Sequence, residues 1–263
     1  MTKPVTVQTI ADYLNVLAPA DLAEPWDHTG LLIGSPDQPV RRVLVSLDAD
    51  LSAINAAVQH QAELMICHHP LIFSPLSSLR IDRPNELQCV RLIQEKISLI
   101  AAHTNLDAAE GGTADCLAAY LLQGHEISVA LQPCAVYGRL ADISEPVLLS
   151  DWRREVAVRL GSSGCRLNTG HDRLIRRVVF WPGAFSEDAI EPVVQARADL
   201  VICGEVKHHV NLALADFGVA LMDVGHDVSE RPVLRPLADT LQQVWPQISF
   251  AVHDGIAYNG IAY

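Results

Sequence analysis

The chain has 263 residues, 49% of them hydrophobic and 19% charged, with a net charge of −12. This length supplies enough apolar material for one large domain or two smaller ones. The acidic balance argues against a protein that binds nucleic acid through a broad basic face. No apolar stretch reaches about 18 residues, which argues against a membrane span.

Two further observations concern the compartment. The first residues lack a basic flank followed by an apolar run, so we expect no signal peptide. The six cysteines are scattered, without a Cys-x-x-Cys pair, which is typical of reduced and mostly buried thiols. We therefore expect a cytoplasmic protein. The eleven histidines, several of them in pairs, are a first indication of metal binding.

Apolar spacing predicts alternating helices and strands in the first half of the chain. We expect helices at 7–17, 51–61, 84–96 and 112–123, and strands at 41–47, 62–67 and 97–102. The strand–helix–strand order over 41–67 predicts a right-handed βαβ unit with a parallel sheet.

The second half is less regular at 129–173, where we expect short strands at 135–140 and 146–149 and a helix at 151–160. The alternation then returns, with strands at 174–181, 198–203, 219–224 and 248–252 and helices at 186–197 and 230–245. Together these elements predict the α/β class.

Part of the first half recurs 135 to 136 residues later. Arg41-Arg42-Val43 returns as Arg176-Arg177-Val178, and the pattern Ala-x-Leu-x-Ile-Cys occurs at 62–67 and again at 198–203. A shift of one residue over a whole βαβ unit favours two related lobes. The alternative is that two βαβ units converged on similar apolar residues.

Polar clusters follow four of the predicted strands. They are His68-His69, residues 103–107 (His-Thr-Asn-Leu-Asp), Glu205 with His208-His209, and His226 with Glu230. Because ligands bind at the carboxyl ends of parallel strands in α/β sheets, we expect the four clusters to converge at such an edge. Mixed imidazole and carboxylate donors suit zinc, iron, manganese, nickel or cobalt.

Each cluster alone has a simpler interpretation. A His-His pair is more often part of a surface loop or of the core, and Asp107 could be a turn residue. Glu230 could be a first-turn acid behind Ser229 as N-cap. Four clusters after four strands outweigh these interpretations and favour metal binding. Asp107 and Glu230 could bridge two metals, which make water a strong nucleophile at neutral pH.

Other chemistries find little support in the sequence. Neither a Gly-x-Ser-x-Gly elbow nor a Walker-type loop occurs. Gly111-Gly112-Thr113 could hold a phosphate, but a helix entry is the simpler interpretation. Cys67 and Cys203 end apolar runs and are expected to pack rather than react.

Four motifs together resemble the Ngg-interacting-factor-three-like family, which also carries the label GTP cyclohydrolase 1 type 2. They are His-His-Pro-Leu-Ile-Phe at 68–73, His-Thr-Asn-Leu-Asp-Ala-Ala-Glu-Gly-Gly at 103–112, Gly-Glu-Val-Lys-His-His at 204–209 and Asp-Val-Gly-His-Asp-Val-Ser-Glu at 223–230. Residues 26–31, Trp-Asp-His-Thr-Gly-Leu, are similar to the family's N-terminal signature. The resemblance covers nearly the whole chain.

The resemblance implies two interlinked, related α/β lobes with mainly parallel central sheets and a dinuclear metal site in the cleft. We expect a metal-carrying lobe formed by residues 1–128 and 220–263, with a smaller lobe, 129–219, inserted in it. The motif at 204–209 would border the cleft from the smaller lobe. The resemblance also implies a homohexamer.

The resemblance implies two divalent transition metal ions per subunit, such as zinc, iron or manganese. Carried over by motif, their ligands are His68, His69, Asp107, His226 and Glu230, with the carboxylates bridging. His103 becomes the candidate catalytic residue, in an acid/base or supporting role near the metals, and no residue is assigned to a further cofactor.

These expectations combine into a dinuclear-metal-dependent hydrolase that acts on a small-molecule substrate. One form is a GTP cyclohydrolase-type reaction, in which hydroxide between the metals opens the purine ring of a nucleotide. A phosphoesterase is another form, because fold and family do not decide between them. The alternative is a non-catalytic metal-binding or regulatory protein that acts through protein partners.

Overall fold

The computed structural model describes residues 4–162 and 164–255. These residues form two compact units, each built around one β-sheet. The first unit comprises residues 4–110 and 234–255, and the second comprises residues 111–162 and 164–233. Within this described part, no helix is long and apolar enough to cross a membrane.

The first unit is an α/β sandwich with a mostly parallel sheet. Its elements are α1 (Val7–Leu17), η1 (Ala20–Leu22), β1 (Gly30–Ile33), β2 (Arg42–Ser46), α2 (Leu51–His60), β3 (Leu64–Cys67), α3 (Pro84–Gln94), β4 (Ser98–Ala101), α4 (Thr104–Ala108), α10 (Leu234–Val244) and β11 (Ser249–His253). The strand order is β1-β4-β3-β2-β11. Only the β1–β4 pair is antiparallel among the described strands of this sheet.

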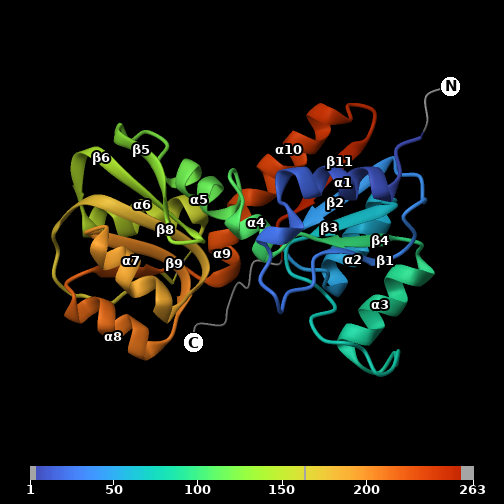
Figure 1. Cartoon of the computed structure of the whole chain (residues 1–263), viewed down its shortest axis with the longest axis horizontal. Coiled ribbons are helices and arrows are strands. Elements are labelled where there is room, and N and C mark those ends of the chain that lie inside the picture. Colours follow the sequence, from blue (N-terminus) through green and yellow to red (C-terminus); the bar gives the residue numbers. More distant parts are fainter. Residues whose placement is uncertain (1–3, 163, 256–263) are drawn as a thin grey trace. The chain divides into compact units, whose positions relative to one another are not determined.

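Local chemistry explains where these elements begin and end. The Thr6 hydroxyl accepts a hydrogen bond from the Thr9 amide and starts α1, and the Asp50 carboxylate does the same for Ala53 at the start of α2. Gln61 takes a left-handed conformation and ends α2 before β3. In Figure 1, α1 and α10 lie above this sheet and α2 and α3 lie below it, so that both faces are covered.

The second unit has a mixed sheet. Its elements are α5 (Thr113–Leu121), β5 (Ile127–Cys134), β6 (Gly138–Leu148), α6 (Leu149–Leu160), β7 (Arg166–Leu167), β8 (Leu174–Phe185), η2 (Glu187–Ala189), α7 (Ile190–Gln195), β9 (Leu200–Val206), α8 (His208–Asp216), β10 (Ala220–Asp223), α9 (His226–Glu230) and η3 (Arg231–Val233). The strand order is β5-β6-β8-β9-β10-β7, and β8, β9 and β10 are parallel.

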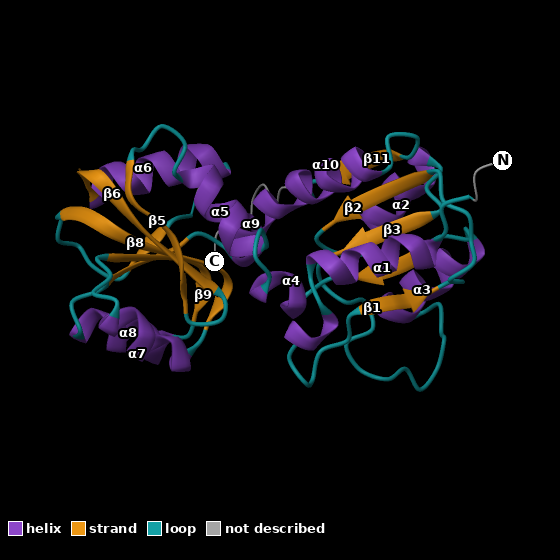
Figure 2. Ribbon diagram, turned by 45° about the horizontal axis from the view of Figure 1, so that its top comes forward, coloured by secondary structure: helices purple, strands orange, loops and turns teal. Residues whose placement is uncertain are grey.

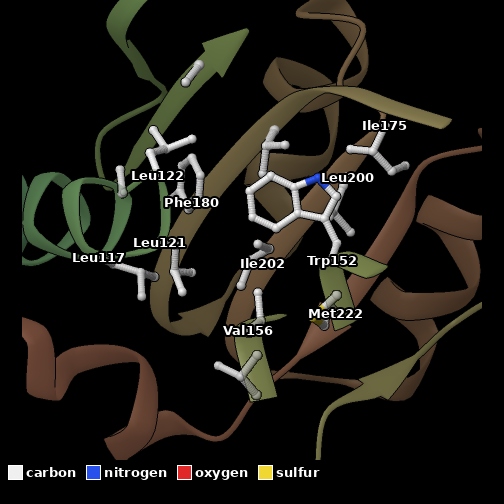
Figure 3. Close-up of a cluster of buried hydrophobic side chains, with 14 of the residues drawn as sticks. Leu117, Leu121, Leu122, Trp152, Val156, Ile175, Phe180, Leu200, Ile202 and Met222 are labelled. Atoms are coloured by element: carbon white, nitrogen blue, oxygen red, sulfur yellow. The ribbon is translucent and has the colours of Figure 1, made fainter. Parts of the chain in front are cut away.

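Two layers of helices bury the second sheet. Figure 2 shows α5 and α6 on one side of it and α7 and α8 on the other. On the α5–α6 side, Trp152 of α6 is fully buried and lies among side chains of β8, β9 and β10, including Ile175, Leu200, Ile202 and Met222 (Figure 3). A fully buried tryptophan contributes one of the largest apolar areas that a single residue can.

The two units repeat the same core layout. The series β2-α2-β3-α3-β4-α4 of the first unit matches β8-α7-β9-α8-β10-α9 of the second, and each series ends in a helix of five residues. The anchoring also repeats: Glu63 accepts hydrogen bonds from the amides of residues 41 and 42, and Asp199 accepts them from the amides of residues 176 and 177. The sequence repeat therefore corresponds to a repeated βαβαβα core.

The predicted helices and strands agree with the structure where apolar periodicity is strong, and several differ from it elsewhere. Instead of the short strands expected at 135–140 and 146–149, the structure has the long hairpin β5–β6, in which β5 is a largely exposed edge strand. The helix expected at 230–245 is divided into α9, η3 and α10, with two prolines around the break. The helix α8 follows the Gly-Glu-Val-Lys motif directly and was not predicted.

The boundaries of the units differ from the expected 128/129 and 219/220. The structure divides at 110/111 and 233/234. Residues 111–128 belong to the second unit because α5 packs on β8, and residues 220–233 belong there because β10 pairs with β9. The sheet of the second unit is also not mainly parallel, since β5, β6 and β7 run antiparallel to their neighbours. Residues 1–3 and 256–263 of the expected first lobe lie outside the described residues.

Candidate metal-binding clusters

Four candidate residues of the first unit lie at the carboxyl ends of two adjacent parallel strands. His68 and His69 follow β3 directly, and His103 follows β4 and caps α4, which carries Asp107. We call these four residues the histidine cluster. One ring nitrogen from each of the three histidines lies within 4.8 Å of the others. An Oδ1 atom of Asp107 lies 3.4 Å from Nε2 of His68.

The Nδ1 atom of each histidine is held by an oxygen acceptor. His68 Nδ1 lies 2.8 Å from the Ala102 carbonyl, His69 Nδ1 lies 2.9 Å from Asp48 Oδ1, and His103 Nδ1 lies 2.9 Å from Asp27 Oδ1. Carbonyl and ionised carboxylate oxygens only accept hydrogen bonds, so Nδ1 carries the proton in all three rings. Each ring therefore presents the lone pair of Nε2, the arrangement found around metal-ligating histidines.

Asp27 is held by several hydrogen bonds at once. Its side chain is fully buried and accepts hydrogen bonds from His103 Nδ1, from the Thr104 amide at 3.0 Å and from the Thr104 hydroxyl at 2.5 Å. Burial raises the pKa of Asp27, but the hydrogen bonds outweigh burial and hold that pKa below its usual value. Asp27 therefore remains an anion that orients the His103 ring.

Burial also governs the protonation of His103. Removal from water lowers the pKa of the imidazole, and the hydrogen bond and charge of Asp27 oppose this only in part. The net effect is a pKa below the usual value for histidine. His103 is therefore neutral near pH 7 and can accept a proton or a metal at Nε2.

The second unit has its own cluster on α9, the helix that matches α4 in the repeated layout. His226 and Glu230 begin and end this five-residue helix, so they lie on one face, with Nε2 3.1 Å from Oε1. Glu205, which follows the apolar part of β9, lies 3.4 Å from Nδ1 of His226. We call these three residues the α9 cluster. The Glu230 side chain is only 4% exposed.

Two glycines make room for the α9 cluster. Gly183 has a φ of +66°, and a Cβ atom there would lie 2.5 Å from Oε1 of Glu230. A Cβ atom at Gly204 would lie 2.5 Å from the Ser229 hydroxyl and 2.8 Å from Cα of His226. The Ser229 hydroxyl accepts a hydrogen bond from the Gly183 amide and donates one to the His226 carbonyl. The glycines at 183 and 204 thus leave the space that α9 and the Glu230 carboxylate occupy.

The rest of the motif at 204–209 lines a pocket within the second unit. This pocket has a volume of about 460 Å³, and Glu205, Lys207 and His209 are among the residues that line it. His208 and His209 are exposed at the start of α8, and His209 Nε2 lies 3.5 Å from Glu187. The two histidines therefore belong to neither cluster, whereas Glu205 belongs to the α9 cluster and to the pocket.

The structure changes two expectations about the candidate ligands. They follow strands of two sheets rather than one, since His226 and Glu230 lie in the second unit. Ser229 does not cap the C-terminal helix; it lies inside α9, which ends at Glu230. Sequence reasoning also assigned no role to Asp27 or Asp48. Asp48 directly follows the residues predicted as a strand, as His68 and His103 do, and the same rule would have identified it.

Both clusters have the donors that a transition metal needs. Neutral imidazole nitrogens and carboxylate oxygens suit zinc, iron or manganese, and they lack the thiolates of a structural zinc site. The nearby Cys67 is not an alternative, because burial raises the pKa of its thiol to about 12. These residues therefore fit metal ions.

Comparison with known proteins agrees with the sequence resemblance. Residues 5–255 match the sequence model of a family described as Duf34/NIF3 (NGG1p interacting factor 3). A protein of Campylobacter jejuni named GTP cyclohydrolase 1 type 2 homolog is 30% identical over 246 residues, covering 92% of this chain and 95% of that protein. A protein of the same name from Clostridium perfringens is 27% identical over 238 residues, covering 88% and 90%.

Solved structures share the fold. A hypothetical protein of Staphylococcus aureus superposes with a TM-score of 0.88 at 27% identity, covering 99% of this chain and 100% of that chain. A Bacillus cereus protein related to NIF3 gives a TM-score of 0.87 at 20% identity, covering 100% of both chains. At that lower identity the likeness concerns the fold alone.

Proposed function

The chain belongs to the Duf34/NIF3 family, and on this premise we propose that it is a dinuclear-metal-dependent hydrolase. One observation carries the proposal: three histidines at adjacent strand ends all have Nδ1 held by an oxygen acceptor, which leaves Nε2 as the unprotonated nitrogen of each ring. Holding three rings in this way fixes both their tautomer and their orientation, as metal coordination requires. A purely structural histidine has no need of such an arrangement.

The ligands that we propose are His68, His69, Asp107, His226 and Glu230. A transition metal in an open site takes three or more protein ligands, so neither cluster alone has the donors for two ions. Asp107 and Glu230 are the carboxylates that can bridge, and each is carried by the five-residue helix that ends its repeated core. The repeated layout therefore supports one carboxylate from each unit.

When bound, the two metals would supply Lewis-acid polarisation of the substrate and an activated water. Among the protein's own side chains, His103 is the candidate catalytic residue, and its role is to accept a proton. Its Nδ1 is fixed by Asp27, and its pKa is lowered, chiefly by burial, so that Nε2 can accept a proton at neutral pH. Asp27 acts as the positioning residue for this ring.

The name of the relatives suggests one reaction of this class. They are named GTP cyclohydrolase 1 type 2 homologs, and we propose a nucleotide as substrate, with hydrolytic opening of its purine ring as the reaction. Phosphoester hydrolysis is the other reaction that such a site supports. We further propose a cytoplasmic homohexamer, which sedimentation of the purified protein would test.

Metal analysis and one substitution test the hydrolase together. Purified protein should retain close to two transition metal ions per chain. Asp107→Asn should lose metal and turnover of nucleotides or phosphoesters while keeping its circular dichroism spectrum. Asp37→Asn, at an exposed turn, is the matched control and should change neither.

A second substitution separates proton transfer from metal binding. His103→Gln should retain metal but lose turnover, because it removes the proton acceptor and leaves the five ligands in place. Loss of metal in this variant would make His103 a ligand instead. A wild-type protein that holds metal and turns over no nucleotide, phosphoester or amide would favour the non-catalytic metal-binding alternative.

A further inference from the structure

Two exposed aromatic side chains border the histidine cluster within the first unit. Trp26 and Phe73 are each 53% exposed, although their rings contact each other with centroids 5.7 Å apart and planes inclined by 47°. Trp26 belongs to the motif at 26–31 and Phe73 to the motif at 68–73. The metal chemistry proposed above gives neither residue a role.

The position of Trp26 relates it directly to the candidate catalytic residue. Its indole meets the His103 imidazole edge to face, with centroids 6.2 Å apart and planes inclined by 72°. His103 in turn lies 5.3 Å and 5.6 Å, centroid to centroid, from the rings of His68 and His69. The aromatic pair therefore adjoins the histidine cluster through the contact between Trp26 and His103.

The loop that carries Trp26 is firmly held. The Thr104 hydroxyl accepts a hydrogen bond from the Glu24 amide and donates one to the Asp27 carboxylate. The Asp27 amide donates to the Glu24 carbonyl, and the His28 amide donates to Asp27 Oδ1. The backbone on both sides of the exposed Trp26 is therefore held by hydrogen bonds, and the indole itself contacts the rings of Phe73 and His103.

We propose that Trp26 and Phe73 form an aromatic shelf that holds the planar ring of the substrate beside His103. Because the planes of the two rings are inclined by 47°, one of them stacks on the face of the substrate ring and the other contacts its edge. This rests on the proposed hydrolase function and specifies its substrate class as a heteroaromatic base, such as a purine. Stacking suits this position because a bound flat ring buries apolar area that both side chains expose. Stacking also accepts flat rings in a range of orientations.

The test is direct binding of ligands that differ in one part. The full-length, metal-loaded protein is titrated by calorimetry with guanosine, with GMP and with ribose 5-phosphate, which lacks the base. Guanosine and GMP should bind, and ribose 5-phosphate should bind more weakly. Trp26→Ala should weaken guanosine binding roughly 5- to 150-fold, the range seen when one aromatic stacking partner of a base is removed. Phe73→Ala should act in the same direction.

Two further variants make the result specific. Trp26→Phe should keep most of the affinity, because a flat ring remains. Phe217→Ala removes another exposed aromatic ring, 63% exposed on the second unit, and should change nothing. Guanosine should also quench tryptophan fluorescence in wild type and in Trp245→Phe but not in Trp26→Phe, since the tryptophans at 152 and 181 are buried.

The outcomes separate this proposal from the proposed function. Turnover with a KM that Trp26→Ala leaves unchanged overturns the shelf and leaves the hydrolase standing. Base-dependent binding that Trp26→Ala abolishes, in a protein without turnover, supports the shelf and counts against the hydrolase. The shelf is also overturned if ribose 5-phosphate binds as well as GMP. The shelf is overturned as well if Trp26→Ala changes the mass measured by sedimentation and leaves the guanosine affinity unchanged. Trp26 would then lie at an interface between copies of the chain.

Discussion

Replacing Gly183 by alanine tests whether the α9 carboxylate is a metal ligand. The new methyl carbon would lie 2.5 Å from Oε1 of Glu230, whereas an ordinary close contact between carbon and oxygen is about 3.3 Å. The carboxylate must therefore retreat by roughly 0.8 Å. Metal–ligand distances tolerate only about 0.2 Å, so this displacement is incompatible with an unchanged site.

The cost in stability should be small by comparison. A left-handed φ costs alanine about 1–2 kcal/mol, and the reduced freedom of the unfolded chain returns about 0.4–1 kcal/mol. The contact with Glu230 adds little, because the end of a flexible side chain can move. We therefore expect Gly183→Ala to lose about 1 kcal/mol of unfolding free energy and to bind metal roughly 10- to 100-fold more weakly.

Gly161→Ala is the matched control. Gly161 has almost the same positive φ, +64°, but a Cβ atom there meets nothing within 4 Å. Urea denaturation should give both variants a similar loss of stability, and metal titration should show weaker binding only for Gly183→Ala. Equal metal affinity in the two variants would refute the placement of Glu230 in the metal site.

Three further predictions follow from other contacts. Asp27→Asn should retain metal, as His103→Gln should, but lower turnover roughly 10- to 100-fold and destabilise the fold by about 1–3 kcal/mol, because the buried acceptor that orients the His103 ring is replaced; metal titration, turnover assays and thermal denaturation would measure these effects. Asp142 accepts two hydrogen bonds of 2.6 Å from Arg177, which lower its pKa. The stability advantage of wild type over Asp142→Asn should therefore be present above about pH 4 and disappear as the pH falls through the folded-state pKa, as urea denaturation at a series of pH values would show. Chelation should lower the melting temperature of the metal-loaded protein. At free metal a hundredfold above Kd, the lost stability is about 2.7 kcal/mol. The melting temperature of His68→Ala should not change on chelation, because this variant lacks a ligand.

Periodicity alone located much of the fold. The bounds of α1 agree with the prediction at both ends, and β2, α2, β3, α3 and β4 agree within two residues. These elements bury a regular apolar face, which local sequence encodes directly. The hairpin β5–β6 could not be found in this way, because pairing with β8 rather than its own apolar content holds it in the sheet.

The sequence repeat indicated two related cores, but it did not show that each core ends in a short helix with candidate metal ligands. Gly204-Glu205 of the second copy stands where His68-His69 stands in the first. The structure shows that the repeat extends through α4 and α9. The second copy carries the candidate ligands His226 and Glu230 on the helix that matches the one carrying Asp107. Two five-residue helices are too short to be recognised by periodicity.

The sequence by itself determined the family, because the family motifs lie along the chain, and it named candidate metal ligands from side-chain chemistry. Only the tertiary structure decided which nitrogen each histidine presents and which residues hold it. The hydrogen bonds responsible join His69 to Asp48 and His103 to Asp27, residues 21 and 76 positions apart. Contacts over such distances arise when strands pair and loops fold back, and local patterns of hydrophobicity do not encode them.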